Sequence, residues 1–158
     1  MATERPVVHA ARDRDTSRRE DHIRRGYARM RSGYSGHVDG IIRFYDDFGV
    51  IPICAEQQVY HPRLMYAGTF DLYAQCDHHQ YAMIDFKSSG DERATALQLA
   101  GYTLDGLVGA PSDKPITTGM MVTLDGNGGY KVKVFDLRNW WPRWKAVLTV
   151  YSLKRVKV

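Results

Sequence analysis

Two apolar segments joined by a short polar turn constrain this chain more than any other feature. The segments are Tyr66–Gln75 (YAGTFDLYAQ) and Tyr81–Lys87 (YAMIDFK), and the residues between them, Cys76–Gln80, are mostly polar. Short runs rich in aromatic and β-branched residues, separated by a polar turn, are typical of antiparallel strands. The sequence therefore predicts a β-hairpin near the middle of the chain, with the remaining elements arranged around it.

The segments before this hairpin predict one helix and one further strand. Residues His37–Phe48 carry apolar side chains at helical spacing, and Gly49 is suited to end that helix. Residues 50–61 (VIPICAEQQVYH) are rich in Val and Ile and predict a strand, which Pro62 should interrupt. Residues 1–32 are Arg-rich and poor in large apolar residues, so we expect a flexible basic arm or a marginal helix there.

The segments after the hairpin predict a helix, a second hairpin and a final helix. Residues 91–108 form an amphipathic pattern that Ser89 or Asp91 can cap. Residues 116–124 and 130–137 predict strands, and Asp125-Gly-Asn-Gly-Gly is suited to the turn between them. The last helix should begin near Pro142. The expected apolar stripes are Ala94, Leu97, Gly101, Leu104 and Val108 in the first helix, and Trp144, Val147, Leu148 and Tyr151 in the last.

The order helix, three strands, helix, two strands, helix predicts an α/β fold. We expect one domain over residues 33–158, built on a central mixed β-sheet of about five strands flanked by helices. No apolar run approaches the roughly 18 residues of a membrane span, and the N-terminus lacks an apolar signal segment. We therefore expect a cytoplasmic protein without a membrane partner. The two cysteines, Cys54 and Cys76, are expected to be reduced and structural.

The charge is distributed unevenly along the chain. Residues 1–31 carry a net +4, residues 32–136 a net −6, and residues 137–158 a net +6. Acidic residues gathered at a metal site, with basic ends that hold a phosphate backbone, would produce this distribution. A basic disordered tail beside an ordinary solvated surface would produce it equally well. The charge pattern alone therefore leaves both interpretations open.

Two carboxylates and one ammonium group come together in the central hairpin. If its turn centres on Asp77–His79, Asp71 and Asp85 lie opposite each other, and cross-strand neighbours are roughly 5 Å apart. Lys87 follows Asp85 by two residues and points to the same face. Hard oxygen ligands suit Mg²⁺ or Mn²⁺ better than zinc. A metal held in this way can activate water against a phosphodiester. The alternative is a set of solvated surface ions.

The order of these motifs resembles the PD-(D/E)XK nuclease superfamily, in its RecB-type and lambda-exonuclease-type branch. The residues that carry the resemblance are Glu56, then AGTFD ending in Asp71, then IDFK from Asp85 to Lys87, then QLAGY from Gln98 to Tyr102. The resemblance implies a restriction-endonuclease-like core. It implies Mg²⁺, with Mn²⁺ as a substitute, held by Asp71, Asp85, the backbone carbonyl of Phe86 and Glu56. It implies that Lys87 serves the attacking water.

The resemblance also extends to a helix and to nucleic-acid contacts. Gln98 and Tyr102 share one stripe of the expected helix, and the family directs this pair to the active site or to the nucleic-acid backbone. An exposed Gln beside a half-buried Tyr is the alternative. We expect further nucleic-acid contacts from Arg63 and Ser88. His37 is the local candidate for the metal-contacting His of several members, but a surface His at a helix start is the favoured interpretation.

The function that these features predict is a metal-dependent deoxyribonuclease. The resemblance favours an exonuclease of phage recombination or DNA repair, active in the bacterial cytoplasm if a phage encodes it. DNA is the expected partner, together with a second copy of the chain or a recombination partner protein. A structure-selective or site-specific endonuclease is the alternative within enzymes. A nucleic-acid-binding module without catalysis is the alternative from another class.

Overall fold

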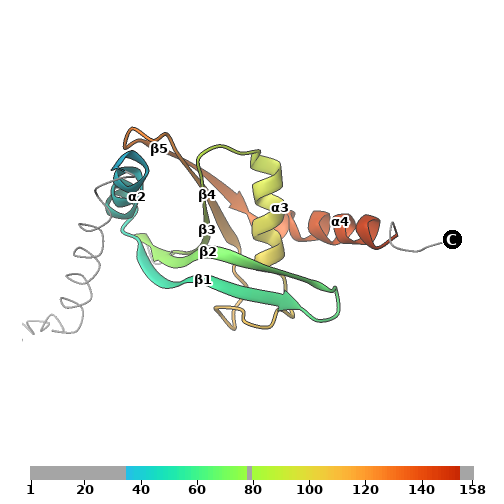
Figure 1. Cartoon of the computed structure of the whole chain (residues 1–158). Helices are drawn as coiled ribbons and strands as arrows, with labels where there is room; N and C mark the ends of the chain where they lie inside the picture. Colours follow the sequence, from blue (N-terminus) through green and yellow to red (C-terminus); the bar gives the residue numbers. More distant parts are fainter. Residues whose placement is uncertain (1–34, 78–79, 154–158) are drawn as a thin grey trace, which may run out of the picture.

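The structure, a computed structural model, describes residues 35–77 and 80–153. The expected N-terminal arm, residues 1–32, lies outside the described residues. No helix in the described part of the chain is long and apolar enough to cross a membrane. In chain order the elements are α2 (Ser35–Asp47), β1 (Ile51–His61), β2 (Tyr66–Cys76), β3 (Gln80–Lys87), α3 (Glu92–Tyr102), β4 (Thr118–Leu124), β5 (Tyr130–Asp136), the 3-10 helix η2 (Leu137–Asn139) and α4 (Trp141–Leu153) (Figure 1).

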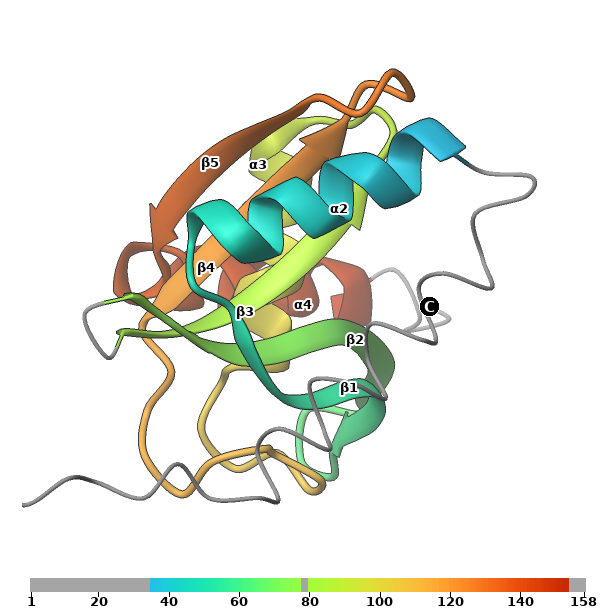
Figure 2. The same cartoon turned by 90° about the vertical axis from the view of Figure 1, so that its left-hand side faces the viewer.

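The strands form one mixed sheet in the order β1-β2-β3-β4-β5. Neighbouring strands are antiparallel except β3 and β4, which run parallel. A parallel pair requires a crossover connection, which α3 and its loops supply. Helix α2 covers one face of the sheet, and α3 covers the other with α4 beside it (Figures 1 and 2). The predicted α/β fold with a five-stranded mixed sheet is therefore confirmed.

Each face of the sheet has its own apolar core. Phe44 of α2 packs with Ile84 and other residues on one face, and Leu99 of α3 packs with Met83 and other residues on the opposite face. Successive side chains of a strand point to opposite faces. Asp85, two residues after Met83, therefore points into the α3 side of the sheet. This alternation places a carboxylate inside an otherwise apolar layer.

Helix α3 is shorter than the sequence pattern predicts. The cap prediction is correct, because Asp91 Oδ1 accepts a hydrogen bond of 2.8 Å from Ala94 N. The helix ends at Tyr102 instead of residue 108, and the hydroxyl of the next residue, Thr103, donates to Leu99 O. Hydroxyl side chains that bond to the backbone in this way compete with helix continuation. The buried residues of the helix are Thr95, Ala96, Leu99, Ala100 and Gly101. Of the predicted stripe, Gly101 and Leu104 are buried and Leu97 is half-buried, whereas Ala94 and Val108 are exposed.

Helix α4 begins as predicted but is not a core helix. Pro142 lies in its first turn, and none of its residues is fully buried. Trp144 is half-buried, while the side chains of Val147 and Tyr151 are 44% and 54% exposed. The apolar stripe expected for this helix is therefore only partly covered, with Leu148 also half-buried. The reason is geometric, because α4 follows the last strand and extends outward beside α3 (Figure 1).

Candidate active site

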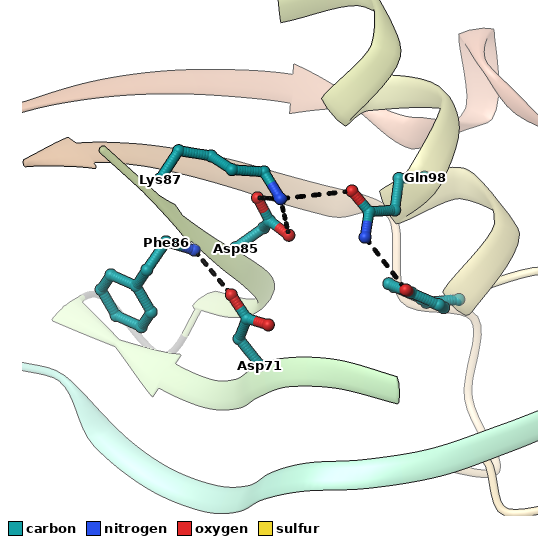
Figure 3. Close-up of polar contacts among 6 residues, drawn as sticks. Asp71, Asp85, Phe86, Lys87 and Gln98 are labelled. Atoms are coloured by element: carbon teal, nitrogen blue, oxygen red, sulfur yellow. Dashed lines mark hydrogen bonds and ion pairs between the residues drawn. The ribbon is translucent and has the colours of Figure 1, made fainter. Parts of the chain in front are cut away.

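The hairpin of β2 and β3 brings the two predicted aspartates together. Leu72 pairs with Ile84 in the last rung of the ladder, so the next opposite pair is Asp71 and Asp85. At this point the ladder gives way to a side-chain contact, because Asp71 Oδ2 accepts a hydrogen bond of 2.8 Å from Phe86 N (Figure 3). The predicted register of the hairpin is confirmed.

Asp85 is almost completely buried, with 2% of its surface exposed. The ammonium of Lys87 donates to Asp85 Oδ1 at 3.1 Å and lies 2.9 Å from Oδ2. The second contact is an ion pair only, since Oδ2 has no well-aligned hydrogen-bond donor among the described residues. Lys87 is the nearest compensating charge, and its own side chain is 30% exposed. One buried carboxylate oxygen is therefore compensated by the charge of Lys87 without a hydrogen bond.

The surroundings of Asp85 oppose its ionisation. Burial raises the pKa of Asp85 above its ordinary value of 3.8, and the charge of Asp71 raises this pKa further, whereas the hydrogen bond and charge of Lys87 lower it. The net direction is upward because burial is the largest cause. Burial of an ionised Asp85 is therefore unfavourable when no metal is bound. A divalent cation between the two aspartates would offset this unfavourable free energy.

Helix α3 connects to the site through a short chain of hydrogen bonds. Lys87 Nζ donates to Gln98 Oε1 at 3.4 Å, and Gln98 Nε2 donates to the Tyr102 hydroxyl at 3.0 Å (Figure 3). Gln98 and Tyr102 are both partly buried. The structure therefore joins the Gln-x-x-x-Tyr pair to the aspartate–lysine cluster, and the alternative of an exposed Gln98 is wrong.

Glu56 lies near the aspartates in the sheet but does not complete a ligand set. It falls between the rungs Ala55–Leu72 and Gln57–Phe70, which places it opposite Asp71. The ladder has no rung at Glu56, whose φ of +51° lies in the left-handed region and whose side chain is exposed. Among residues 35–77 and 80–153, no group of three His, Cys, Asp or Glu side chains could hold a metal. Irregular backbone of this kind is often found beside functional sites.

The other predicted site residues, Ser88, Arg63 and His37, are all exposed. Ser88 is exposed directly after β3, and Arg63 is exposed in the turn between β1 and β2. His37 is exposed in the first turn of α2, beside Gly126 in the turn between β4 and β5. No contact of His37 with either aspartate is found in the part of the chain that the structure describes. Cys54 and Cys76 are both free, as predicted.

Aromatic contacts that the sequence does not predict lie on the outer side of α3. The Tyr66 hydroxyl donates to Gly101 O at 2.8 Å, and its ring meets the Trp144 ring edge-on at 5.3 Å between centroids. Two glycines permit these approaches, because a Cβ on Gly101 would lie 2.9 Å from Trp144 Cε2, and one on Gly68 would lie 2.6 Å from Tyr102 Cε1. Gly68, a glycine inside a predicted strand, is the sequence feature that indicates such a close approach.

Replacement of Gly68 by Ala is expected to disturb this side of the site. The added Cβ would force the Tyr102 ring away from β2 and weaken its bond to Gln98, at a cost of about 1–3 kcal/mol in unfolding free energy. Urea denaturation of G68A would measure that loss. Gly90→Ala is the matched control, because its Cβ would meet nothing closer than 3.5 Å. Equal stability of the two variants would contradict the described approach of Tyr102 to β2.

No protein-family model and no curated protein matches this sequence. The residues of the site themselves indicate its chemistry. Asp85 provides a buried carboxylate and Asp71 a second carboxylate opposite it. Lys87 provides an ammonium group that the amide of Gln98 holds in place. This arrangement can hold a hard cation next to an anionic oxygen and can orient a water molecule between them.

Proposed function

We propose that this chain is a metal-dependent DNA nuclease that hydrolyses phosphodiester bonds. The observation that carries the proposal is the burial of Asp85 opposite Asp71, with the ammonium of Lys87 within 3.1 Å of its carboxylate. An apolar layer containing two adjacent acids is unfavourable unless a cation joins them. The arrangement supports a site kept for function, because stability alone would favour apolar residues at these positions.

The order of elements supports a restriction-endonuclease-like core of the PD-(D/E)XK type. A helix, three antiparallel strands, a crossover helix and a parallel strand follow one another in this chain. The aspartates lie on the second and third strands, and the Gln and Tyr lie on the crossover helix. These positions are the ones that the resemblance to the RecB-type and lambda-exonuclease-type branch assigns to the catalytic motif.

The donor set fits Mg²⁺, with Mn²⁺ as a substitute. Mg²⁺ in such sites takes one or two carboxylates and keeps several waters, so a cluster of three acidic side chains is not required. Asp71, Asp85 and the Phe86 carbonyl would hold it, and Glu56 would reach it through water. When bound, the ion would polarise the phosphate and lower the pKa of a water molecule.

The residues around that position each have a separate task in this proposal. Lys87 orients the attacking water and balances the charge that develops on the phosphate. Gln98 holds the Lys87 ammonium from α3, and Tyr102 holds Gln98. Gln98 and Tyr102 therefore act as positioning residues. Burial of Asp85 excludes water from one side of the cluster and strengthens these polar contacts.

Hydrolysis of linear DNA by the purified protein is the direct test. We expect nucleotide products with Mg²⁺ or Mn²⁺ and none after chelation with EDTA. If no combination of metal and DNA end gives hydrolysis, the catalytic proposal is wrong. DNA binding without measurable metal affinity would then identify the chain as a non-catalytic nucleic-acid-binding module.

Comparison of linear with covalently closed circular DNA is expected to identify an exonuclease. The resemblance to phage-type exonucleases leads us to expect degradation of the linear form and survival of the circle. End-labelled duplexes would give the polarity of attack. Cutting of the circle at a rate similar to that of the linear form would instead identify an endonuclease, with the same active site.

A further inference from the structure

A cavity of about 300 Å³ lies beside the candidate active site, between β2, α3 and α4. We call it the α3–α4 cavity. Its volume lies at the lower end of the range for small-ligand pockets, roughly 300–1,000 Å³. The lining is mainly aromatic and aliphatic, with one amide: Tyr66, Tyr102, Trp144, Ala94, Leu97 and Gln98. A flat, largely apolar group with a polar edge would fit such a lining.

The α3–α4 cavity shares two residues with the hydrogen-bonded chain that ends at the proposed catalytic cluster. Gln98 and Tyr102 line it and also form the hydrogen-bonded chain that ends at Lys87 Nζ, 3.4 Å from Gln98 Oε1. A molecule in the cavity is therefore separated from Lys87 by a single side chain. Arg93 is exposed one helical turn before Leu97, so a guanidinium lies on the same side of α3. The cavity thus combines aromatic walls with a nearby positive charge.

The Tyr66 wall of the cavity is held in place by a hydrogen bond, and the Trp144 wall meets it edge-on. The Tyr66 hydroxyl is fixed on Gly101 O, and the Tyr66 and Trp144 rings stand at 83° to each other. Trp144 Nε1 is buried and has no well-aligned acceptor among the described residues. Although burial raises the pKa of Tyr66, Trp144 Nε1 lies close enough to the Tyr66 hydroxyl to lower that pKa in part. The edge of a nucleobase offers oxygen and nitrogen acceptors to a donor of this kind. Aromatic side chains also stack on every base, whatever the sequence.

We propose that the α3–α4 cavity holds one unstacked base of the DNA strand whose phosphate lies at Asp71 and Asp85. This inference rests on the proposed nuclease function and adds a requirement to it. A base can enter the cavity only after leaving its pair, so the protein binds DNA that is single-stranded or frayed next to the cut. Arg93 is placed to contact the adjoining phosphate.

An abasic scan of a DNA oligonucleotide tests the inference without cleavage. A duplex with a short single-stranded end is bound in Ca²⁺, with one abasic nucleotide moved along that end. Loss of the base at one position is expected to weaken wild-type binding by about tenfold, which is the scale of a stacked base. A scan that is flat at every position overturns the inference.

A variant that fills the cavity provides the matched comparison. Ala94 is exposed and lines the cavity, so Ala94→Leu blocks it without changing the buried core, whereas Ala146→Leu adds the same bulk to an exposed site on α4 outside the lining. We expect A94L to bind the intact oligonucleotide about tenfold more weakly and to lose the abasic effect. A146L should behave as wild type. An undiminished abasic effect in A94L contradicts the inference.

The same samples separate this inference from the nuclease proposal. Cleavage of linear DNA in Mg²⁺ together with a flat scan means that the base-binding inference fails alone. A position-specific scan without cleavage under any metal means that base binding stands and the nuclease proposal fails. If wild type is dimeric and A94L is monomeric, a second copy occupies the cavity, and the inference is overturned.

Discussion

Lys87→Ala is expected to lower the rate of DNA hydrolysis by at least about 100-fold, the usual scale for loss of a positioned catalytic group. The ammonium lies 3.1 Å from Asp85 Oδ1 and 3.4 Å from Gln98 Oε1, and no other cation among the described residues forms an ion pair with Asp85. The loss should fall on kcat, because DNA affinity depends on many phosphate contacts. Single-turnover cleavage and a separate binding titration would measure the two effects.

Lys131→Ala is the matched control for this variant. Lys131 is an exposed lysine on β5, so its replacement removes the same charge from the surface and none from the site. We expect unchanged kcat in K131A. Cleavage by K87A at the wild-type rate would remove Lys87 from the mechanism. A simple loss of folding is distinguished by the melting temperature and DNA affinity of K87A.

Asp85→Asn is expected to change stability and activity in opposite directions. The amide keeps the shape of the side chain but removes a buried charge that Lys87 only partly offsets. The metal-free variant should therefore melt a few degrees above wild type, since about 1 kcal/mol corresponds to roughly 2–4 °C in a domain of this size. Hydrolysis should be lost, because a cation ligand is removed. Thermal melts and cleavage assays on the same samples test both effects.

The stability gain of D85N should depend on pH in a defined direction. Burial raises the folded-state pKa of Asp85 above 3.8, so the folded protein binds more protons than the unfolded chain between 3.8 and that raised value. Wild-type stability therefore falls as pH rises through this window. The advantage of D85N should be absent below 3.8 and complete above the window. Melting temperatures measured across this pH range would follow the difference.

Metal addition provides the complementary measurement. If Mg²⁺ binds the folded protein at Asp71 and Asp85 as proposed, it should raise the melting temperature of wild type and leave that of D85N unchanged. Asp105→Asn, at an exposed position after α3, is the control and should respond to Mg²⁺ as wild type does. A wild-type protein that is more stable than D85N without metal would contradict the stated cost of burying Asp85.

The sequence predicted the hairpin site well because its constraints are local. A short turn between two strands fixes the register, and the register fixes Asp71 opposite Asp85. The i, i+2 spacing then fixes Lys87 on the same face as Asp85. The position of Gln98 could be predicted for a similar reason, because α3 begins where Asp91 caps it. In each case a rule that spans a few residues determines the position.

The remaining features depend on long-range packing that no local pattern encodes. Glu56 lies at a break in the ladder between β1 and β2, where its φ is positive. The apolar pattern of residues 50–61 does not reveal this break. The end of α3 depends on side-chain bonds of Thr103, and residues 104 and 108 remain apolar beyond it. The α3–α4 cavity requires two glycines that face aromatic rings more than 30 residues away in sequence.

Helix α4 has no fully buried residue, yet its Trp144 forms one wall of the α3–α4 cavity. A helix attached by few buried contacts opens at a lower free energy than the sheet core. The Trp144 wall should therefore move more easily than the opposite walls, where β2 holds Tyr66 and α3 holds Tyr102. Purines and pyrimidines differ in width by a fused ring. A cavity with one mobile wall can accept both, which the proposed base-binding site requires if the protein cuts DNA without sequence preference.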